Sequence, residues 1–139
     1  MEFTIQSKKR EEIIDITKQV KKVVAELLEK DKRRICNKKI ESCFVYCPHT
    51  TCSIIINEFS DENIKEDILS ALKKIVQKGE WKHDCQNGNA DSHIKSTILG
   101  TSQTIPIENN QLALGTWQKI ALADFDGPRK RKVIVKIFN

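Results

Sequence analysis

Three short polar segments of the chain each contain one histidine together with other side chains that can do chemistry. These segments are Pro48-His49-Thr50-Thr51, Trp81-Lys82-His83-Asp84 and Asn87-Gly88-Asn89-Ala90-Asp91-Ser92-His93. Histidine binds transition metals and transfers protons near neutral pH. Because the sequence has no further histidine, we expect His49, His83 and His93 to form one shared site.

Three neutral imidazoles can hold zinc and leave a fourth position for water or substrate. Zinc is the divalent metal that this ligand type favours, whereas magnesium fits if the substrate carries a diphosphate. The spacing of the histidines does not separate a metal site from three loop histidines held by hydrogen bonds. Both interpretations stay open from the residues alone.

Acidic side chains accompany the histidines and could orient an imidazole or accept a proton. They are Glu58, Asp67, Asp84 and Asp91. Asp91 has an alternative role as the cap of a short helix, and Asp67 has one as an exposed helical charge. We expect Glu58 or Asp91 to act as the base of a metal-assisted reaction.

Two further segments could bind a substrate. Arg129 follows the turn Asp126-Gly127-Pro128, and its guanidinium could hold a phosphate or carboxylate through two parallel hydrogen bonds; a structural salt bridge is the alternative. Trp117 and Gln118 could stack against and hydrogen-bond a planar ligand, although a tryptophan at such a position is more often an anchor of the core or of a subunit interface. Together they predict a phosphorylated small-molecule substrate.

Length and composition predict one domain with one ordinary core, because the chain has 139 residues of which 39% are hydrophobic. No apolar run is long enough for a membrane span and no signal pattern begins the sequence, so we expect a cytoplasmic protein with reduced thiols. The net charge of +5 favours anions. Nucleic-acid binding is not expected, because the positive charges are interspersed with acids and no recognition motif accompanies them.

The five cysteines divide into two groups by their neighbours. Cys43, Cys47 and Cys52 lie among apolar residues and are expected to pack as small hydrophobes. Cys85 lies two residues after His83 and could contact the site.

Hydrophobic periodicity and turn residues predict an α+β domain over residues 1–139 with a mainly antiparallel sheet, two longer helices and one short helix. The helices are expected over residues 15–29, 61–78 and 91–99, with Gly79 and Gly100 as C-terminal caps of the last two. The strands are expected over residues 42–47, 51–56, 102–107, 111–114, 116–123 and 132–138. A basic surface connection is expected over residues 29–39, and a polar loop over residues 80–91.

Motifs along nearly the whole chain resemble a family of small uncharacterised proteins of the UPF0047 type, which are often labelled secondary thiamine-phosphate synthases. The residues that carry the resemblance are Asp15-Ile16-Thr17, His49-Thr50-Thr51, Ile56-Asn57-Glu58, Asp67, Trp81-x-His83, Asn89-Ala90-Asp91-Ser92-His93, Gly100-Thr101-Ser102, Leu114-Gly115-Thr116-Trp117-Gln118 and Asp126-Gly127-Pro128-Arg129-x-Arg131.

The resemblance implies a barrel-like sheet, a homotrimer, and a polar pocket near the subunit boundaries that contains the motif histidines. It carries over His49, His83 and His93 as metal or catalytic residues. Their implied neighbours are Glu58, Asn89, Asp91 and Arg129, with Thr50 assigned to substrate binding. The sequence departs from the family pattern at Asp124, where glutamate is usual, and in the glycine-free basic connection 29–39. The shorter Asp124 side chain puts an acid or base role at that position in doubt.

Three functions fit these residues. The family label implies a thiamine-phosphate synthase-like transfer between phosphorylated small molecules with loss of diphosphate. A metal-dependent hydrolase, with the histidines holding the ion and Arg129 binding the anionic substrate, fits the residue types better, since diphosphate enzymes usually hold magnesium through carboxylates. A noncatalytic metal- or metabolite-binding trimer would have every coordination position filled by protein.

Overall fold

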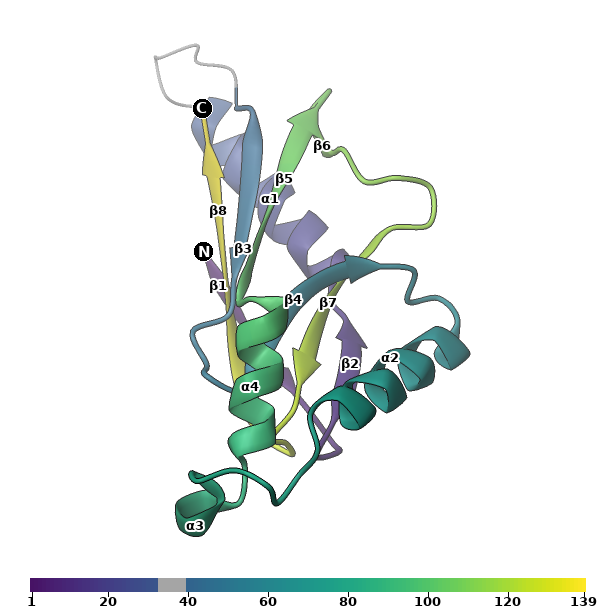
Figure 1. The fold of residues 1–139 in the computed structure, drawn as a ribbon. Helices are drawn as coiled ribbons and strands as arrows, with labels where there is room; N and C mark the ends of the chain where they lie inside the picture. The colour runs from purple at the N-terminus through teal and green to yellow at the C-terminus, as the bar shows by residue number, and fades with distance from the viewer. Residues whose placement is uncertain (33–39) are drawn as a thin grey trace.

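The structure is a computed structural model that describes residues 1–32 and 40–139, with the side chains of residues 31 and 32 excluded. Its strands form two antiparallel sheets that curl around one core as an open half-barrel (Figure 1). One sheet has five strands in the order β1-β8-β3-β5-β6, and the other has three in the order β2-β7-β4. The strands are β1 (Glu2–Gln6), β2 (Glu12–Asp15), β3 (Ser42–Tyr46), β4 (Cys52–Asn57), β5 (Ser102–Glu108), β6 (Gln111–Leu112), β7 (Lys119–Asp124) and β8 (Lys130–Phe138).

Four helices accompany the sheets in the described part of the chain. They are α1 (Thr17–Lys32), α2 (Glu62–Ile75), α3 (Asp84–Asn87) and α4 (Ala90–Leu99). Helix α1 packs against β6, β7 and β8, whereas α4 lies across β4 on another side of the strands (Figure 1). None of the helices that the structure describes has the length and apolar character needed to cross a membrane.

The main core lies between α1 and the inward faces of both sheets. Val20 and Val24 of α1 meet Val45, Val133 and Val135, which alternate with outward residues along β3 and β8. Strand β7 is buried on both faces, because Ile120 and Leu122 join this core while Ala121 and Ala123 join a second cluster with residues of α2. Each fully buried aliphatic side chain contributes about 1.5–3 kcal/mol, so the apolar pattern stabilises the half-barrel.

The structure confirms the predicted α+β class and most predicted elements. Strands 42–47, 51–56 and 102–107 correspond to β3, β4 and β5 within one or two residues, and the short helix corresponds to α4, which ends before Gly100. Helix α2 begins after Asp61, whose side chain accepts a hydrogen bond from the backbone amide of Asn63. These agreements arise where apolar periodicity was strong.

Several boundaries were predicted wrongly. Helix α2 ends at Ile75 with Val76 as its cap, so Gly79 lies beyond the helix end. Helix α1 continues to Lys32, which makes the start of the predicted connection 29–39 helical; its remainder, with Cys36, lies outside the described residues. The predicted strand 116–123 begins only at Lys119.

Three elements were not predicted at all: β1, β2 and the single turn α3 within the polar loop. Strand β1 alternates exposed and half-buried residues along its length. Strand β2 is only four residues long and pairs with β7. Both are short edge strands whose pairing partners lie near the other end of the chain, so local sequence carried little signal for them.

Serine hydroxyls attach α4 to the strand ends beneath it. Ser92 Oγ donates to the carbonyl of Phe125 at 2.6 Å, and Ser96 Oγ donates to the carbonyl of Cys52 at 2.6 Å. Ser53 Oγ in turn donates to the Ser96 carbonyl at 3.3 Å. These buried hydrogen bonds fix the orientation of α4, and therefore of the histidine that it carries.

Gly127 lies where the turn after β7 touches the β1–β2 connection. Its amide donates to the carbonyl of Arg10 at 2.9 Å. A Cβ atom there would collide with the backbone carbonyl oxygen of Lys9 and lie 2.6 Å from Ser7 Oγ. Only glycine therefore lets the two segments approach this closely.

We expect Gly127→Ala to lower the free energy of unfolding by about 1–3 kcal/mol or more, because a backbone carbonyl cannot move aside cheaply. Urea unfolding followed by circular dichroism measures this loss. Gly115→Ala is the matched control, since its Cβ would meet only the flexible Gln118 side chain, at 3.4 Å or more. Equal losses in both variants would contradict the close approach at Gly127.

Candidate functional site

His83 and His93 face each other at the N-terminal end of α4. Their ring centres are 5.2 Å apart and their planes are nearly perpendicular, at 83°. His83 is exposed just before α3, and His93 is half-buried in the first turns of α4. The structure thus brings together two of the three predicted site histidines from segments ten residues apart.

The carboxylate of Asp84 holds the loop that presents His83. Its Oδ1 atom accepts a hydrogen bond from the backbone amide of Ala90 at 3.1 Å, and its Oδ2 atom accepts one from that of Trp81 at 3.1 Å. Asp84 thereby connects the start of the loop to the start of α4. This gives the predicted acidic companion a positioning role for His83.

His49 makes a different contact, with the backbone of β8. Its Nε2 atom accepts a hydrogen bond from the amide of Lys132 at 2.8 Å, just past the end of β3. Burial and the nearby positive charge of Arg131 lower the pKa of His49. The ring is therefore neutral near pH 7, and because Nε2 is the acceptor, the proton lies on Nδ1.

The three histidines do not form one metal-binding cluster within a single chain. In residues 1–32 and 40–139, no group of three or more His, Cys, Asp or Glu side chains is placed to hold a metal ion. Within the described part of one chain, His49 therefore does not join the other two in such a group. Its Nε2 atom is held by the Lys132 amide, and a shared metal site stays a prediction.

A surface pocket of about 370 Å³ connects the histidine turn to α4. It is lined by Thr50, His93, Ser96, Thr97, Gly100 and Thr101. The turn after β3 and the outer face of α4 thus share one hollow, whose lining includes side chains with hydroxyl groups and an imidazole. Thr50 and His93, two of the predicted site residues, lie together here.

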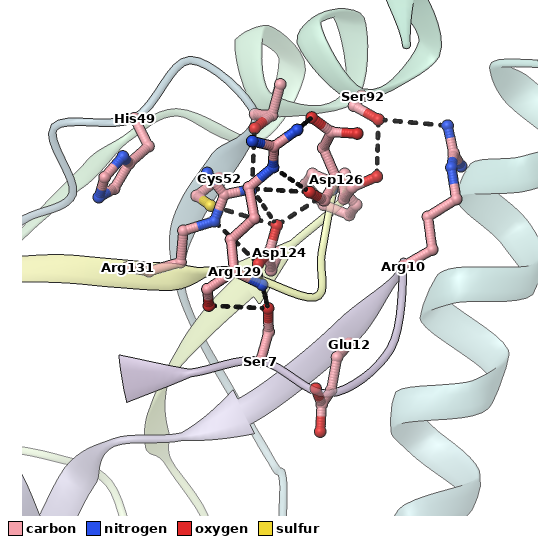
Figure 2. Close-up of polar contacts among 12 residues, drawn as sticks. Ser7, Arg10, Glu12, His49, Cys52, Ser92, Asp124, Asp126, Arg129 and Arg131 are labelled. Carbon is pink, nitrogen blue, oxygen red and sulfur yellow. Dashed lines mark hydrogen bonds and ion pairs between the residues drawn. The ribbon is translucent and has the colours of Figure 1, made fainter. Parts of the chain in front are cut away.

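Asp126 contacts Arg129 (Figure 2) and also Asn89 at the N-terminus of α4. Its Oδ2 atom accepts hydrogen bonds from Asn89 Nδ2 at 3.1 Å and from Arg129 at 3.2 Å. Arg129 also donates through Nε to the Asp126 carbonyl at 2.9 Å, yet its side chain remains 60% exposed. The structural salt bridge considered for Arg129 is present, and its remaining N–H groups still face outward.

Arg131 and Asp124 form a buried ion pair that the residue patterns did not indicate (Figure 2). Arg131 Nε donates to Asp124 Oδ2 at 2.9 Å, and its terminal nitrogen donates to Oδ1 at 2.6 Å. Ser7 Oγ donates to Oδ2 at 2.6 Å, and Thr51 Oγ1 accepts from Arg131 at 3.1 Å. The sequence signals here were the departure from the family pattern at Asp124 and the presence of Thr51 and Arg131 in the family motifs, and none of them indicated the pairing.

The charge state of Asp124 follows from these contacts. Burial by itself raises the pKa of the carboxyl group, but the hydrogen bonds from Arg131 and Ser7 outweigh it, so the net pKa is lowered. The group is held ionised by its partners. Asp124 is therefore a structural anion rather than a proton donor or acceptor.

Asp91, a predicted catalytic base, is also enclosed by cations. It is fully buried, and its two oxygens contact Arg10 at 2.8 Å and Lys95 at 3.0 Å. Burial raises the pKa of this carboxyl group, but the hydrogen bonds from Arg10 and Lys95 lower it more. It does not cap α4, whose N-cap position is Asn89. These contacts favour a structural role for Asp91.

The remaining predicted residues lie at the surface. Trp117 is 68% exposed, so it does not anchor the core of the chain, and Gln118 Oε1 accepts a hydrogen bond from the Gly115 amide at 2.8 Å. Glu58 is half-buried one residue beyond β4. Their roles toward a ligand stay predictions.

Three cysteines pack as predicted, and Cys85 is exposed. Cys43, Cys47 and Cys52 are fully buried, and burial raises the pKa of the Cys43 thiol to about 12. Cys52 Sγ donates to Asp124 Oδ1 at 3.5 Å. Cys85 lies in α3, directly after Asp84.

The whole chain, residues 1–139, matches the family model described as UPF0047 protein YjbQ-like. The chain belongs to the UPF0047 family. It is 45% identical to a UPF0047 protein of Archaeoglobus fulgidus over 137 residues, covering 98% of each chain. It is 37% identical to the UPF0047 protein YugU of Bacillus subtilis over 136 residues, covering 96% of this chain and 94% of that one.

Solved structures of UPF0047-type proteins share the fold. A crystal structure from Clostridium acetobutylicum has a TM-score of 0.87 and 43% identity, with 99% of each chain covered. One from Sulfolobus solfataricus, described as a YbjQ-like protein of unknown function, has a TM-score of 0.87 and 32% identity, with 99% and 94% covered. The names of these relatives assign no activity, so family membership does not support the thiamine-phosphate synthase label.

Proposed function

We propose that this UPF0047 chain is one subunit of a homotrimeric, metal-dependent hydrolase that acts on a phosphorylated small molecule. The observation that carries the proposal is the His83–His93 pair, with ring centres 5.2 Å apart. Two imidazoles this close need only small rotations to direct nitrogens at a common ion. Imidazole ligands favour zinc or a similar transition metal over magnesium.

Two histidines alone are too few for a catalytic zinc site, which usually has three protein ligands and an open position. The third donor in our proposal comes from a second subunit, because no third donor in the described residues of one chain completes the group. When bound, the metal would supply Lewis-acid chemistry and an activated water. This is why the proposal requires an oligomer.

The surrounding residues suit an anionic substrate. His49 presents its Nδ1–H group because the Lys132 amide occupies Nε2, so it can donate a hydrogen bond to a phosphate oxygen. Thr50 shares a pocket with His93, and the exposed part of Arg129 adds a cation. In this scheme Glu58 is the candidate base, while Asn89 keeps Asp126 in place through its 3.1 Å hydrogen bond.

The carboxylate chemistry disfavours the diphosphate-transfer alternative. Such enzymes usually hold magnesium through free carboxylates. Asp91 and Asp124 instead bind Arg10, Lys95 and Arg131. Hydrolysis at a histidine-bound transition metal therefore agrees better with the arrangement than a magnesium-dependent transfer does.

The test is metal content and phosphatase activity of the zinc-reconstituted protein, with His83→Ala/His93→Ala beside the wild type. We expect stoichiometric zinc and hydrolysis of p-nitrophenyl phosphate in the wild type, and neither in the double variant. Because both side chains are at least partly exposed, its free energy of unfolding should change by no more than about 0.5 kcal/mol.

Two further measurements separate the parts of this proposal. His49→Ala should retain zinc but bind phosphate esters more weakly, since His49 is assigned to the substrate. Light scattering should give a trimer. If the His83→Ala/His93→Ala variant keeps its zinc, the metal assignment is wrong. If the wild type binds zinc but hydrolyses no phosphate ester, the protein binds metal without being a hydrolase. If a monomer binds a full equivalent of zinc, the third donor does not come from a second subunit.

A further inference from the structure

A cleft of about 560 Å³ lies on the side of α4 opposite the histidines. It is lined by Arg10, Glu11, Ser70, Lys73, Lys74, Val76, Gln77, Lys78, Asp91 and Lys95. Asp91 and Lys95 are four residues apart and share one helix face, whereas His93 and Thr97 point to the other, since each residue advances by about 100°. The cleft is thus separate from the histidine pocket.

The floor of the cleft is an unusually charged buried network. Lys95 is 1% exposed, and its Nζ atom contacts Glu11 Oε1 at 2.7 Å and Asp91 Oδ2 at 3.0 Å. Arg10 contacts both carboxylates from above, at 3.3 Å and 2.8 Å. These ion pairs hold one another in place, so the floor of the cleft is polar and fixed.

Positive charge is in excess around this floor. Five cationic side chains line the cleft against two carboxylates, and both carboxylates are already paired within the network. The excess lies on the rim, where Lys73, Lys74 and Lys78 are exposed at the C-terminal end of α2 and just beyond it. Three ammonium groups on the rim of one cleft favour a multiply charged anion such as a phosphate group.

One buried carboxylate oxygen in the floor of the cleft has no hydrogen-bond donor within the described residues. Glu11 Oε2 accepts no hydrogen bond within the described part of the chain, and the approach of Lys73 Nζ at 3.2 Å is an ion pair only. The Glu11 side chain is 6% exposed, and the Lys73 ammonium compensates its charge without completing a hydrogen bond to Oε2. A hydroxyl group of a ligand in the cleft would satisfy it.

We propose that this cleft binds a small phosphate monoester that carries hydroxyl groups. The phosphate lies among the three rim lysines, and a hydroxyl donates to Glu11 Oε2 on the floor. The volume falls in the range of roughly 300–1,000 Å³ that is typical of small-molecule sites. This site goes beyond the proposed hydrolase and does not use its histidines.

Isothermal titration calorimetry with ribose 5-phosphate tests the proposal on the full chain. Wild type should bind it at low salt, and Lys73→Gln/Lys74→Gln/Lys78→Gln should weaken binding about tenfold or more. Lys74→Gln/Lys78→Gln, which keeps the Lys73–Glu11 ion pair, should lose less. The matched control is Lys18→Gln/Lys21→Gln/Lys22→Gln, which removes three exposed charges from α1 and should bind normally.

Further measurements distinguish binding in this cleft from binding at the histidine site. In the His83→Ala/His93→Ala background, which removes the proposed metal site, ribose 5-phosphate should still bind, and adding Lys73→Gln/Lys74→Gln/Lys78→Gln should weaken that binding about tenfold or more. Ribose and inorganic phosphate should both bind more weakly than the ester. The proposal would be overturned by no binding to wild type, by an equal loss in the α1 control, or by equal affinity for inorganic phosphate. An unchanged affinity when the three lysine substitutions are added to the histidine variant would also overturn it.

Discussion

Asp124→Asn is expected to lower the free energy of unfolding by about 3–5 kcal/mol, the usual cost of removing one partner from a buried ion pair. Arg131 would keep its charge with a side chain only 6% exposed, and the carboxylate that accepts from it at 2.6 Å and 2.9 Å would be gone. Ser7 would lose its charged acceptor as well. Urea unfolding measures the loss.

Two variants control for other causes. Asp67→Asn removes an exposed carboxylate from α2 and should change stability by no more than about 0.5 kcal/mol. Asp124→Leu/Arg131→Met removes both charges together and should lose less than Asp124→Asn, because apolar pairs often replace buried ion pairs at little cost. A double variant worse than the single one would show that the pair is not the cause.

Low pH should weaken the same Asp124–Arg131 ion pair. Its partners lower the pKa of Asp124 below the ordinary value of 3.8. Its contribution to stability is therefore complete above that value and is lost as the pH falls toward the lowered pKa. Wild type should lose stability over this range, and the Asp124→Asn variant should lose less of it.

Lys95→Met is expected to lower the free energy of unfolding by about 3 kcal/mol or more. Here the substitution removes the cation and leaves two buried carboxylates without it. Its Nζ atom bridges Glu11 at 2.7 Å and Asp91 at 3.0 Å. Methionine keeps the length of the aliphatic stem, so lost packing contributes little. Urea unfolding reports the difference.

A second substitution tests whether the loss of stability comes from the unpaired carboxylates. Adding Glu11→Gln to Lys95→Met removes one of the two stranded charges and should restore part of the lost stability. Lys74→Met, at an exposed position of α2, is the control and should change stability by no more than about 0.5 kcal/mol. If the added glutamine brings no recovery, the network does not carry the effect.

The fold was predictable where periodicity was long and local. The apolar face of α1 and the alternating residues of β3 and β5 placed these elements within a few residues. Strands β1 and β2 were missed because each is stabilised by a distant partner: β1 by β8 and β2 by β7. No local pattern encodes such a pairing.

The candidate site was predictable as a set of residues but not as a geometry. The motifs grouped His83, His93 and Thr50 in one predicted site, and in the structure His83 faces His93 while Thr50 lines a pocket with His93. They could not show that the Lys132 amide, 83 residues away, occupies His49 Nε2. Nor could they show that Lys95 faces Glu11, 84 residues away. Such contacts depend on tertiary packing, and no regular spacing in the sequence indicates them.

The position of the Asp124–Arg131 pair has a consequence for how the molecule opens. Asp124 ends β7 in the three-stranded sheet, whereas Arg131 belongs to β8 in the five-stranded sheet. The two sheets cannot separate without breaking this buried ion pair. We therefore expect the sheets to unfold as one cooperative unit, with low-energy local unfolding restricted to peripheral elements such as α3 and the ends of α2.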